Sequence, residues 1–261
     1  MNIGIIIQAR MGSTRLPGKI LKQFYGGKTV LETILDSLHK VAGVKVIVAT
    51  SVNENNDRLA LFLKEKGELV YRGSENDVLD RFIKAAEING VDGIVRICSD
   101  NPFMDWRGVA QLVEKAKICD ADYIGFRIND KPSILTHFGF WGEFVTLAAL
   151  KRVAETTEEG TPAHEHVTFH IYKHPEEYKC EWIQCPDFLQ ERDDIRLTID
   201  TPEDLTSALK VYSDLKSKDE NFTLQDVVSY LNAHEAIKQL MLSSIAVSYT
   251  HLRAHETGRN L

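Results

Sequence analysis

The first polar loop of the chain, residues 8–19, gathers side chains that bind phosphate. Within ten positions it holds two guanidiniums, one ammonium, two hydroxyls and two glycines, namely Arg10, Gly12, Ser13, Thr14, Arg15, Gly18 and Lys19. Glycines let backbone N–H groups approach an anion closely, and hydroxyls add further donors. Guanidinium and ammonium groups neutralise a polyphosphate. This composition predicts a loop that binds a phosphorylated ligand.

The loop matches neither of the two common phosphate-binding fingerprints. The spacing from Gly12 to Gly18 is one residue too long for the Walker pattern, and Lys19 is followed by isoleucine rather than serine or threonine. The dinucleotide pattern Gly-x-Gly-x-x-Gly is also absent. A solvated basic loop is the alternative interpretation. Three cations so close together in a chain of net charge −7 favour the phosphate site.

Two aspartates stand at the ends of short apolar runs far apart in the sequence. Asp100 follows the run 94–98, and Asp200 follows the run 196–199. Parallel strands deliver their carboxyl ends to one crevice of an open α/β sheet, so we expect both carboxylates beside the first loop. Mg²⁺ prefers one or two carboxylates together with phosphate oxygens and water. The pattern therefore predicts that Asp100 is a metal ligand, and it makes Asp200 a candidate for the second one.

Helix capping is the alternative role for both aspartates. For Asp100 it is the weaker interpretation, because Asp105 is better placed to cap the helix that begins near Trp106. For Asp200 it stays open, because either Asp200 or Thr201 could cap the helix expected from Pro202 onward.

Strands and helices alternate along the first 120 residues. The run Ile3–Ile7 is too short for a globular helix and rich in β-branched residues, which indicates a strand buried on both faces. Further strands are expected at 44–49, 68–71 and 92–98, and helices at 29–41, 56–66, 78–89 and 106–117. This alternation predicts βαβ units in a three-layer α/β/α fold with a mainly parallel, nucleotide-binding sheet.

The alternation is lost after about residue 120. Strands are expected at 123–127, 134–141, 178–184 and 196–199, and helices at 143–155, 161–174, 202–215 and 223–240. We expect one domain, residues 1–242, with an insertion at about 125–190 that covers the ligand or builds a subunit contact. Residues 243–261 show no apolar period and resemble translated vector sequence, which predicts a disordered, non-native tail.

Composition limits the class of protein. The 261 residues are 43% hydrophobic, enough for a full core, and the net charge of −7 argues against a nucleic-acid partner or a membrane-surface protein. No apolar run reaches membrane-spanning length, and the first residues already look like a strand, so we expect neither a membrane span nor a signal peptide. Its four cysteines lack metal-site spacing, which predicts reduced thiols and a cytoplasmic location.

The stretch Gln-Ala-Arg-Met-Gly-Ser-Thr-Arg-Leu-Pro-Gly-Lys, residues 8–19, resembles the signature loop of the CMP-sugar synthetases. The most similar branch is that of the spore-coat polysaccharide (SpsF-like) cytidylyltransferases, which are related to the 3-deoxy-manno-octulosonate and acylneuraminate cytidylyltransferases. The resemblance implies a sheet of the nucleotide-diphospho-sugar transferase type. It also implies that the late segment Asp-Thr-Pro-Glu-Asp-Leu supplies the second magnesium aspartate, at Asp200, and that Asp100 matches the first.

A second polar loop, residues 72–77, belongs to a segment that also resembles a family signature. Cytosine offers an amine, a ring nitrogen and a carbonyl, so a pocket that reads it needs both donors and acceptors. Gly73, Ser74 and Asp77, with backbone groups, could supply these, and Arg72 could contact base or phosphate. An ordinary polar turn with Ser74 or Asp77 as a helix cap is an equally good interpretation.

The histidine-rich stretch 164–170 does not predict a zinc site, because no third ligand has suitable spacing. In the resembling family this segment usually reads Arg-Glu-His-Val-Thr and lines the acceptor side. Here His164 replaces the arginine, and the resemblance assigns Glu165 and His166 to acceptor binding.

Together these observations predict a Mg²⁺-dependent cytidylyltransferase for surface polysaccharide synthesis. Arg10, Arg15 and Lys19 would act on the triphosphate of CTP, with Ala9, Gly12 and Ser13 also at the nucleotide. The expected partners are CTP and an acidic sugar, and a homodimer is expected. A glycosyltransferase on the same fold and a non-catalytic nucleotide-binding regulator are the alternatives.

Overall fold

A mainly parallel sheet forms the middle layer of the protein. The computed structural model describes the backbone of residues 1–257 and the side chains of residues 1–246. In this part of the chain eight strands pair in the order β3-β2-β1-β4-β7-β5-β6, with β8 beside β5. Their bounds are β1 Ile3–Gln8, β2 Lys45–Ser51, β3 Leu69–Gly73, β4 Gly93–Cys98, β5 Tyr123–Ile128, β6 Lys131–Pro132, β7 Glu143–Thr146 and β8 Cys180–Gln184.

Strand β1 lies inside the sheet and is paired on both edges. It runs parallel to β2 on one side and to β4 on the other. Its side chains alternate between two cores: Ile5 and Ile7 pack into one, and Ile6 packs into the other. Burial on both faces explains why the strand reads as an unbroken apolar run.

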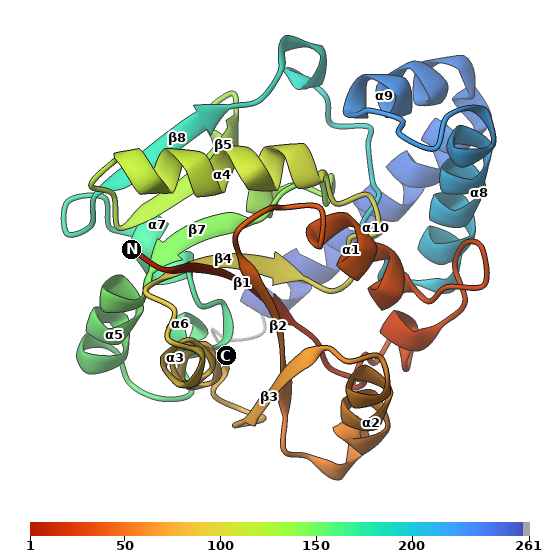
Figure 1. Cartoon of the computed structure of the whole chain (residues 1–261). Coiled ribbons are helices and arrows are strands. Elements are labelled where there is room, and N and C mark those ends of the chain that lie inside the picture. The colour runs from red at the N-terminus through yellow and green to blue at the C-terminus, as the bar shows by residue number, and fades with distance from the viewer. Residues whose placement is uncertain (258–261) are drawn as a thin grey trace.

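Helices cover both faces of this sheet (Figure 1). Side chains of α1, α2 and α4 pack in the core on one face, and those of α3, α5 and α7 pack in the core on the other. The helix bounds are α1 Val30–Leu38, α2 Asp57–Glu65, α3 Val78–Asn89, α4 Trp106–Ile118, α5 Leu147–Thr156, α6 Pro162–Glu165, α7 Phe169–Lys173, α8 Pro202–Lys218, α9 Leu224–Ala233 and α10 Glu235–Thr257. The three-layer α/β/α prediction is confirmed.

The region 125–190, expected to be an insertion, contributes strands to the sheet itself. β7 lies between β4 and β5 and is antiparallel to both, while β8 runs parallel to β5. The helix expected at 143–155 therefore begins only after β7, and the helix expected at 161–174 is two short helices, α6 and α7. Whether other parts of the region cover a ligand or build a subunit contact stays a prediction.

Two strand predictions were wrong. Residues 134–141 contain a 3-10 helix, Ser133–Leu135, followed by irregular backbone, and residues 196–199 form no strand. Both segments carry apolar side chains, such as Phe138 and Ile199, that are buried. Burial alone produced the apolar runs, because an irregular segment that packs on a core needs apolar residues as a strand does.

The segment predicted to be a disordered tail is helical through residue 257. Helix α10 extends from Glu235 to Thr257, and it contacts α8 and α9. Ile245, inside the predicted tail, is 7% exposed. Residues 243–257 are therefore helical where disorder was predicted, while residues 258–261 lie outside the described part. The non-native origin of the segment stays a prediction.

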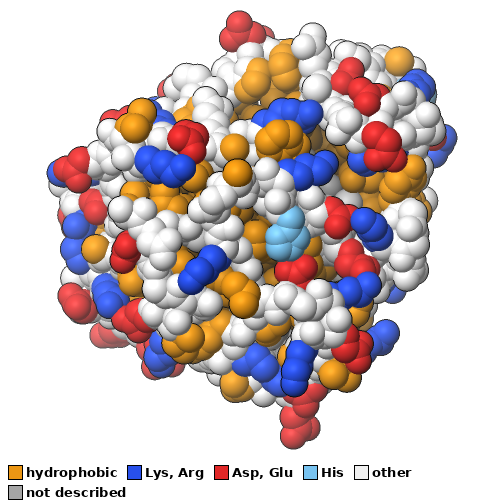
Figure 2. All heavy atoms as spheres, in the orientation of Figure 1, with side chains coloured by type: hydrophobic (Ala, Val, Ile, Leu, Met, Phe, Trp, Pro, Cys, Tyr) orange, Lys and Arg blue, Asp and Glu red, His pale blue; other side chains and the backbone are white. Residues whose placement is uncertain are grey.

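Charged side chains of both signs are interspersed over the face shown in Figure 2. Among the described helices, none combines the length and apolar character needed to cross a lipid bilayer. The four cysteines, Cys98, Cys119, Cys180 and Cys185, are free thiols.

Candidate active site

The first polar loop follows β1 and closes on itself. The carbonyl oxygen of Met11 accepts hydrogen bonds from Ser13 N at 2.9 Å and from Gly18 N at 3.1 Å. Gly18 has φ +64°, a left-handed conformation that glycine adopts without strain. This turn leads directly into the 3-10 helix Lys19–Leu21. The loop thereby places Lys19 at the carboxyl ends of β1 and β4.

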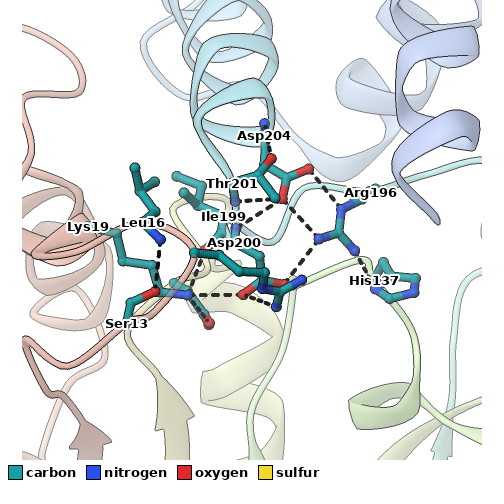
Figure 3. A network of polar contacts seen from close by, with 11 residues as sticks. Ser13, Leu16, Lys19, His137, Arg196, Ile199, Asp200, Thr201 and Asp204 are labelled. Atoms are coloured by element: carbon teal, nitrogen blue, oxygen red, sulfur yellow. Dashed lines mark hydrogen bonds and ion pairs between the residues drawn. The ribbon is translucent and has the colours of Figure 1, made fainter. Parts of the chain in front are cut away.

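Lys19 contacts both predicted metal ligands, and Figure 3 shows it beside one of them, Asp200. Its ammonium donates to Oδ2 of Asp100 at 2.9 Å and to Oδ1 of Asp200 at 3.1 Å. It also donates to the carbonyl oxygen of Ile199 at 2.6 Å. Arg15 adds a second cation, with Nη2 at 3.2 Å from Oδ1 of Asp200. The structure thus brings together Asp100, Asp200, Arg15 and Lys19, as the sequence predicted.

Asp200 does not cap helix α8, so the capping alternative does not describe it. The N-cap is Thr201, whose hydroxyl accepts from Asp204 N at 3.2 Å. The carboxylate of Asp204 accepts in return from Thr201 N, which completes a capping box. The Asp200 side chain instead contacts cations. Asp105, in contrast, caps α4 as expected, accepting from Arg107 N and Gly108 N.

Asp100, Asp200, Arg15 and Lys19 form the charged centre of the site. Within it, Asp200 and Lys19 stabilise each other's ionised forms. Burial alone would raise the pKa of Asp200, but Lys19 and then Arg15 outweigh it, and the pKa is lowered. Burial alone would lower the pKa of Lys19, but Asp100 and then Asp200 outweigh it, and the pKa is raised. At neutral pH Asp200 is therefore a carboxylate and Lys19 an ammonium.

The sequence analysis did not predict a role for Arg196, whose buried guanidinium contacts Asp200 from the protein interior. Arg196 Nη2 donates to Oδ2 of Asp200 at 3.1 Å, and the same guanidinium forms a fork with Asp204 at 2.8 and 2.9 Å. Its third nitrogen lies 2.9 Å from Nδ1 of His137. The only signal in the sequence was spacing, since Arg196 and Asp204 stand four residues before and after Asp200. Such spacing predicts a contact inside a helix, but residues 196–200 are irregular, so it did not predict this ion pair.

The donor set of this centre fits a magnesium ion. Asp100 and Asp200 each direct one carboxylate oxygen at the same ammonium, so these two oxygens lie close together and face one point. Two carboxylate oxygens of this kind are the hard ligands that Mg²⁺ takes from proteins, with phosphate and water completing its shell. The ammonium of Lys19 supplies positive charge at this point.

The other first-loop residues predicted to bind the nucleotide contact the backbone or face solvent. Ala9 is buried and its amide donates to Ala49 O at 3.2 Å. Arg10 and Gly12 are exposed, and a Cβ atom on Gly12 would meet nothing within 4 Å. The hydroxyl of Ser13 accepts from Leu16 N at 3.3 Å, so it stabilises the loop itself.

The second polar loop makes contacts within the protein. Asp77 caps α3 by accepting from Asp80 N at 2.8 Å, and its other oxygen lies 2.9 Å from Nδ1 of His164. Ser74 accepts from Asp77 N at 3.0 Å. Arg72 pairs with the exposed Asp57 at 2.6 Å. These contacts match the turn-and-cap interpretation for Asp77, and base reading by this loop, including Gly73, stays a prediction.

The predicted acceptor residues lie on the short helix α6 and at its end. Glu165 and His166 are exposed, whereas His164 is buried. Because His164 pairs with Asp77, it links α6 to the start of α3 instead of facing solvent. Among the described residues, no hydrogen bond or ion pair joins Glu165 or His166 to the two aspartates, so their acceptor role also stays a prediction.

A cavity of about 330 Å³ lies beside the two aspartates. Asp100, Asp200 and Cys98 line it on one side, and residues 133–141 line it on the other. Two of its lining residues, Asn101 and Thr198, have a buried side-chain oxygen without a hydrogen-bond partner. A larger cavity of about 510 Å³ borders α1, α4 and α8, but neither aspartate lines it. A ligand bound in the smaller cavity would therefore contact the two aspartates.

Comparison with known proteins decides the family. A family model described as cytidylyltransferase matches residues 4–247. The chain belongs to the cytidylyltransferase family. It is 34% identical over 216 residues to the spore coat polysaccharide biosynthesis protein SpsF of Bacillus subtilis, covering 81% of this chain and 86% of that one. The resemblance noted in the sequence is confirmed.

Solved structures agree with this assignment. A cytidylyltransferase from Leptospira borgpetersenii superposes with a TM-score of 0.79 at 30% identity, covering 92% of this chain and 97% of that one. A CMP:2-keto-3-deoxy-manno-octonic acid synthetase complexed with CTP shares the fold, with a TM-score of 0.63 at 16% identity, covering 82% and 99% of the two chains. The cytidylyltransferase fold predicted from the sequence is thereby confirmed.

Proposed function

We propose that this cytidylyltransferase uses Mg²⁺ to transfer CMP from CTP to an acidic sugar or a related acceptor, releasing pyrophosphate, for surface polysaccharide synthesis. The observation that carries the proposal is the meeting of Asp100 and Asp200 at Lys19, directly after the basic first loop. Nucleotidyl transfer from a triphosphate needs carboxylates to hold a metal and cations to neutralise phosphate at one place, and this site has both.

The names of the relatives support the choice of substrates. The structure of the CMP:2-keto-3-deoxy-manno-octonic acid synthetase contains CTP, and the name of the SpsF relative refers to spore coat polysaccharide biosynthesis. A CTP-dependent reaction with a sugar acid in polysaccharide synthesis is the activity that these names suggest for this chain.

In the proposed reaction, an acceptor hydroxyl attacks the α-phosphorus of CTP. The new P–O bond forms as the bond to the bridging oxygen of pyrophosphate breaks, and the hydroxyl proton passes to solvent. Arg10, Arg15 and Lys19 hold the triphosphate and offset the charge that develops on the leaving pyrophosphate. Mg²⁺ held by Asp100 and Asp200 supplies further positive charge at the phosphate oxygens.

The cavity beside the aspartates is the proposed place of the acceptor. Asn101 and Thr198, each with a buried side-chain oxygen that has no hydrogen-bond partner, line it, and Phe138, Phe140 and Trp141 give it an apolar wall. The loop 72–77 is the proposed place of the cytosine base. A homodimer and a cytoplasmic location stay proposals drawn from the sequence.

The test is a pyrophosphate-release assay with each of the four nucleoside triphosphates, Mg²⁺ and a panel of sugar acids. We expect release only with CTP, Mg²⁺ and a suitable acceptor together. CTP with Mg²⁺ should also raise the melting temperature more than ATP or GTP does. Equal shifts with all nucleotides would remove the cytidylyl assignment while leaving nucleotide binding.

A further inference from the structure

Cations reach the two oxygens of Asp200 from two different sides. Lys19 and Arg15 contact Oδ1 at 3.1 and 3.2 Å. Arg196 contacts Oδ2 at 3.1 Å (Figure 3). The first two cations come from the phosphate-binding loop, and the third comes from the segment that leads into Asp200. The carboxylate is therefore held between a loop that would meet the nucleotide and a segment that belongs to the protein interior.

These cations differ in how firmly the protein holds them. The side chain of Arg15 is 50% exposed and that of Lys19 is 12% exposed, whereas that of Arg196 is 1% exposed. A buried guanidinium persists only where acceptors satisfy its N–H groups. Arg196 has such acceptors on every side, so it cannot turn toward an incoming phosphate as the two loop cations can.

The partners of Arg196 are themselves fixed. Asp204 is 6% exposed, and besides forming the fork it accepts from the amides of Asp200 and Thr201, each at 3.0 Å. Burial, and then the charge of Arg196, lower the pKa of His137 to about 4. His137 is therefore neutral at pH 7, and its Nδ1 accepts from the guanidinium. The guanidinium is thereby tied to the start of α8 and to the backbone of Asp200.

We propose that Arg196 is a positioning residue that anchors Oδ2 of Asp200, so that Oδ1 stays directed into the cleft when Lys19 and Arg15 turn to the triphosphate. This inference rests on the proposed function, because it assumes that Asp200 ligates the metal. Without Arg196 the carboxylate can rotate about its Cβ–Cγ bond, and Asp204 becomes an uncompensated buried charge beside it. Lysine supplies a point charge but no planar fork, so it replaces arginine only in part.

The test measures Mn²⁺ binding in the presence of a non-reacting α,β-methylene analogue of CTP, by the paramagnetic resonance of free Mn²⁺. Groups that orient a metal ligand typically change metal affinity by about 10- to 100-fold when they are removed. We therefore expect Arg196→Met to weaken Mn²⁺ binding by about that factor, and Arg196→Lys to weaken it less. Affinity for the analogue measured without metal should not change, because Arg196 does not reach the first loop.

Arg192→Met is the matched control. Arg192 forms a comparable fork with Asp194, at 2.6 and 2.9 Å, four residues earlier in the same segment. Its third nitrogen donates to Asn232, so its hydrogen bonds go to residues other than Asp200. This control should bind Mn²⁺ and the analogue like the wild type. Millimolar guanidinium chloride should restore part of the Mn²⁺ affinity of Arg196→Met and leave Arg192→Met unchanged.

Three outcomes separate the inference from the proposed function. Mn²⁺ binding by Arg196→Met and Arg196→Lys that equals the control overturns the positioning role. A parallel loss of analogue affinity without metal also overturns it, because that loss indicates a general structural effect; Arg196→Lys decides the case if the methionine variant does not fold. A wild type that binds Mn²⁺ no better with the analogue than without it overturns the proposed metal site itself.

Discussion

The backbone amide of Ile199 donates a hydrogen bond of 2.9 Å to the carbonyl oxygen of Asp100. This single bond joins the turn after β4 to an irregular segment a hundred residues later in the chain. It places the following residue, Asp200, next to Asp100, and the ammonium of Lys19 bridges the two carboxylates. The centre thus depends on a contact between two loops and not on a shared ladder of strands.

Asp100→Asn and Asp200→Asn should each abolish metal-dependent turnover, with a loss on the order of 100-fold or more. Neither change should unfold the protein, because the partner of Asp200 in the interior, Arg196, keeps its fork with Asp204. The double variant should be no worse than either single one, as for groups that act as one unit. Steady-state pyrophosphate release and thermal unfolding measure both effects. Near wild-type turnover in either variant contradicts the metal-ligand assignment.

Lys19→Met should lower turnover and at the same time increase the affinity of the nucleotide-free protein for Mn²⁺. The ammonium occupies the point that both carboxylates face, so its removal leaves two negative charges without their counter-ion. An increase of about tenfold, equivalent to ~1.4 kcal/mol, is expected. Lys22→Met, in the same segment, is the control. If both variants bind Mn²⁺ like the wild type, Lys19 does not compete for the site.

The stability of the protein should fall between pH 6.5 and pH 4 because of His137. Burial, followed by Arg196, lowers the folded pKa of His137 from 6.5 to about 4. In this window the unfolded chain binds a proton that the folded chain does not, so acid favours unfolding, and the full stability is present above pH 6.5. The contribution is less than about 3 kcal/mol, because solvent screens the partly exposed imidazole.

Chemical unfolding of the wild type and of His137→Gln, at pH 7 and at pH 4.5, measures this contribution. The glutamine variant should lose less stability on acidification than the wild type does. His39→Gln is the control, since His39 is exposed and pairs with Glu68 at the surface. Equal acid sensitivity of all three proteins would show that His137 is not held neutral.

Removal of residues 248–261 should leave turnover and melting temperature unchanged, because the family match ends at residue 247. Removal of residues 241–261 should lower the melting temperature, because it also removes Met241 and Ile245, which are 2% and 7% exposed. Each buried side chain of this size contributes about 1.5–3 kcal/mol. Differential scanning calorimetry of the two truncated chains checks this. A large drop for the shorter deletion would show that the end of α10 stabilises the fold.

Local signals in the sequence were sufficient for much of the fold. Helix α3 has the predicted bounds, and α1 begins after Thr29 with a capping box to Glu32. The basic loop after β1, the position of Asp100 after β4 and the helix cap at Asp105 were also predicted from local sequence. Capping, periodicity and glycine turns depend on residues within a few positions of one another, so a single segment carries the whole signal.

The arrangement of the segments was decided by the tertiary structure. β7 enters the sheet antiparallel between β4 and β5, and the run before Asp200 is buried without being a strand. The sequence alone determined which side chains were expected at the centre: two aspartates, a lysine and two arginines, of which Arg15 pairs with Asp200 in the structure. Only the folded chain determined that Arg196 donates a hydrogen bond to Asp200 and that Lys19 bridges the two carboxylates. Such pairings join residues far apart in the chain, and their energy exists only once the intervening elements have packed.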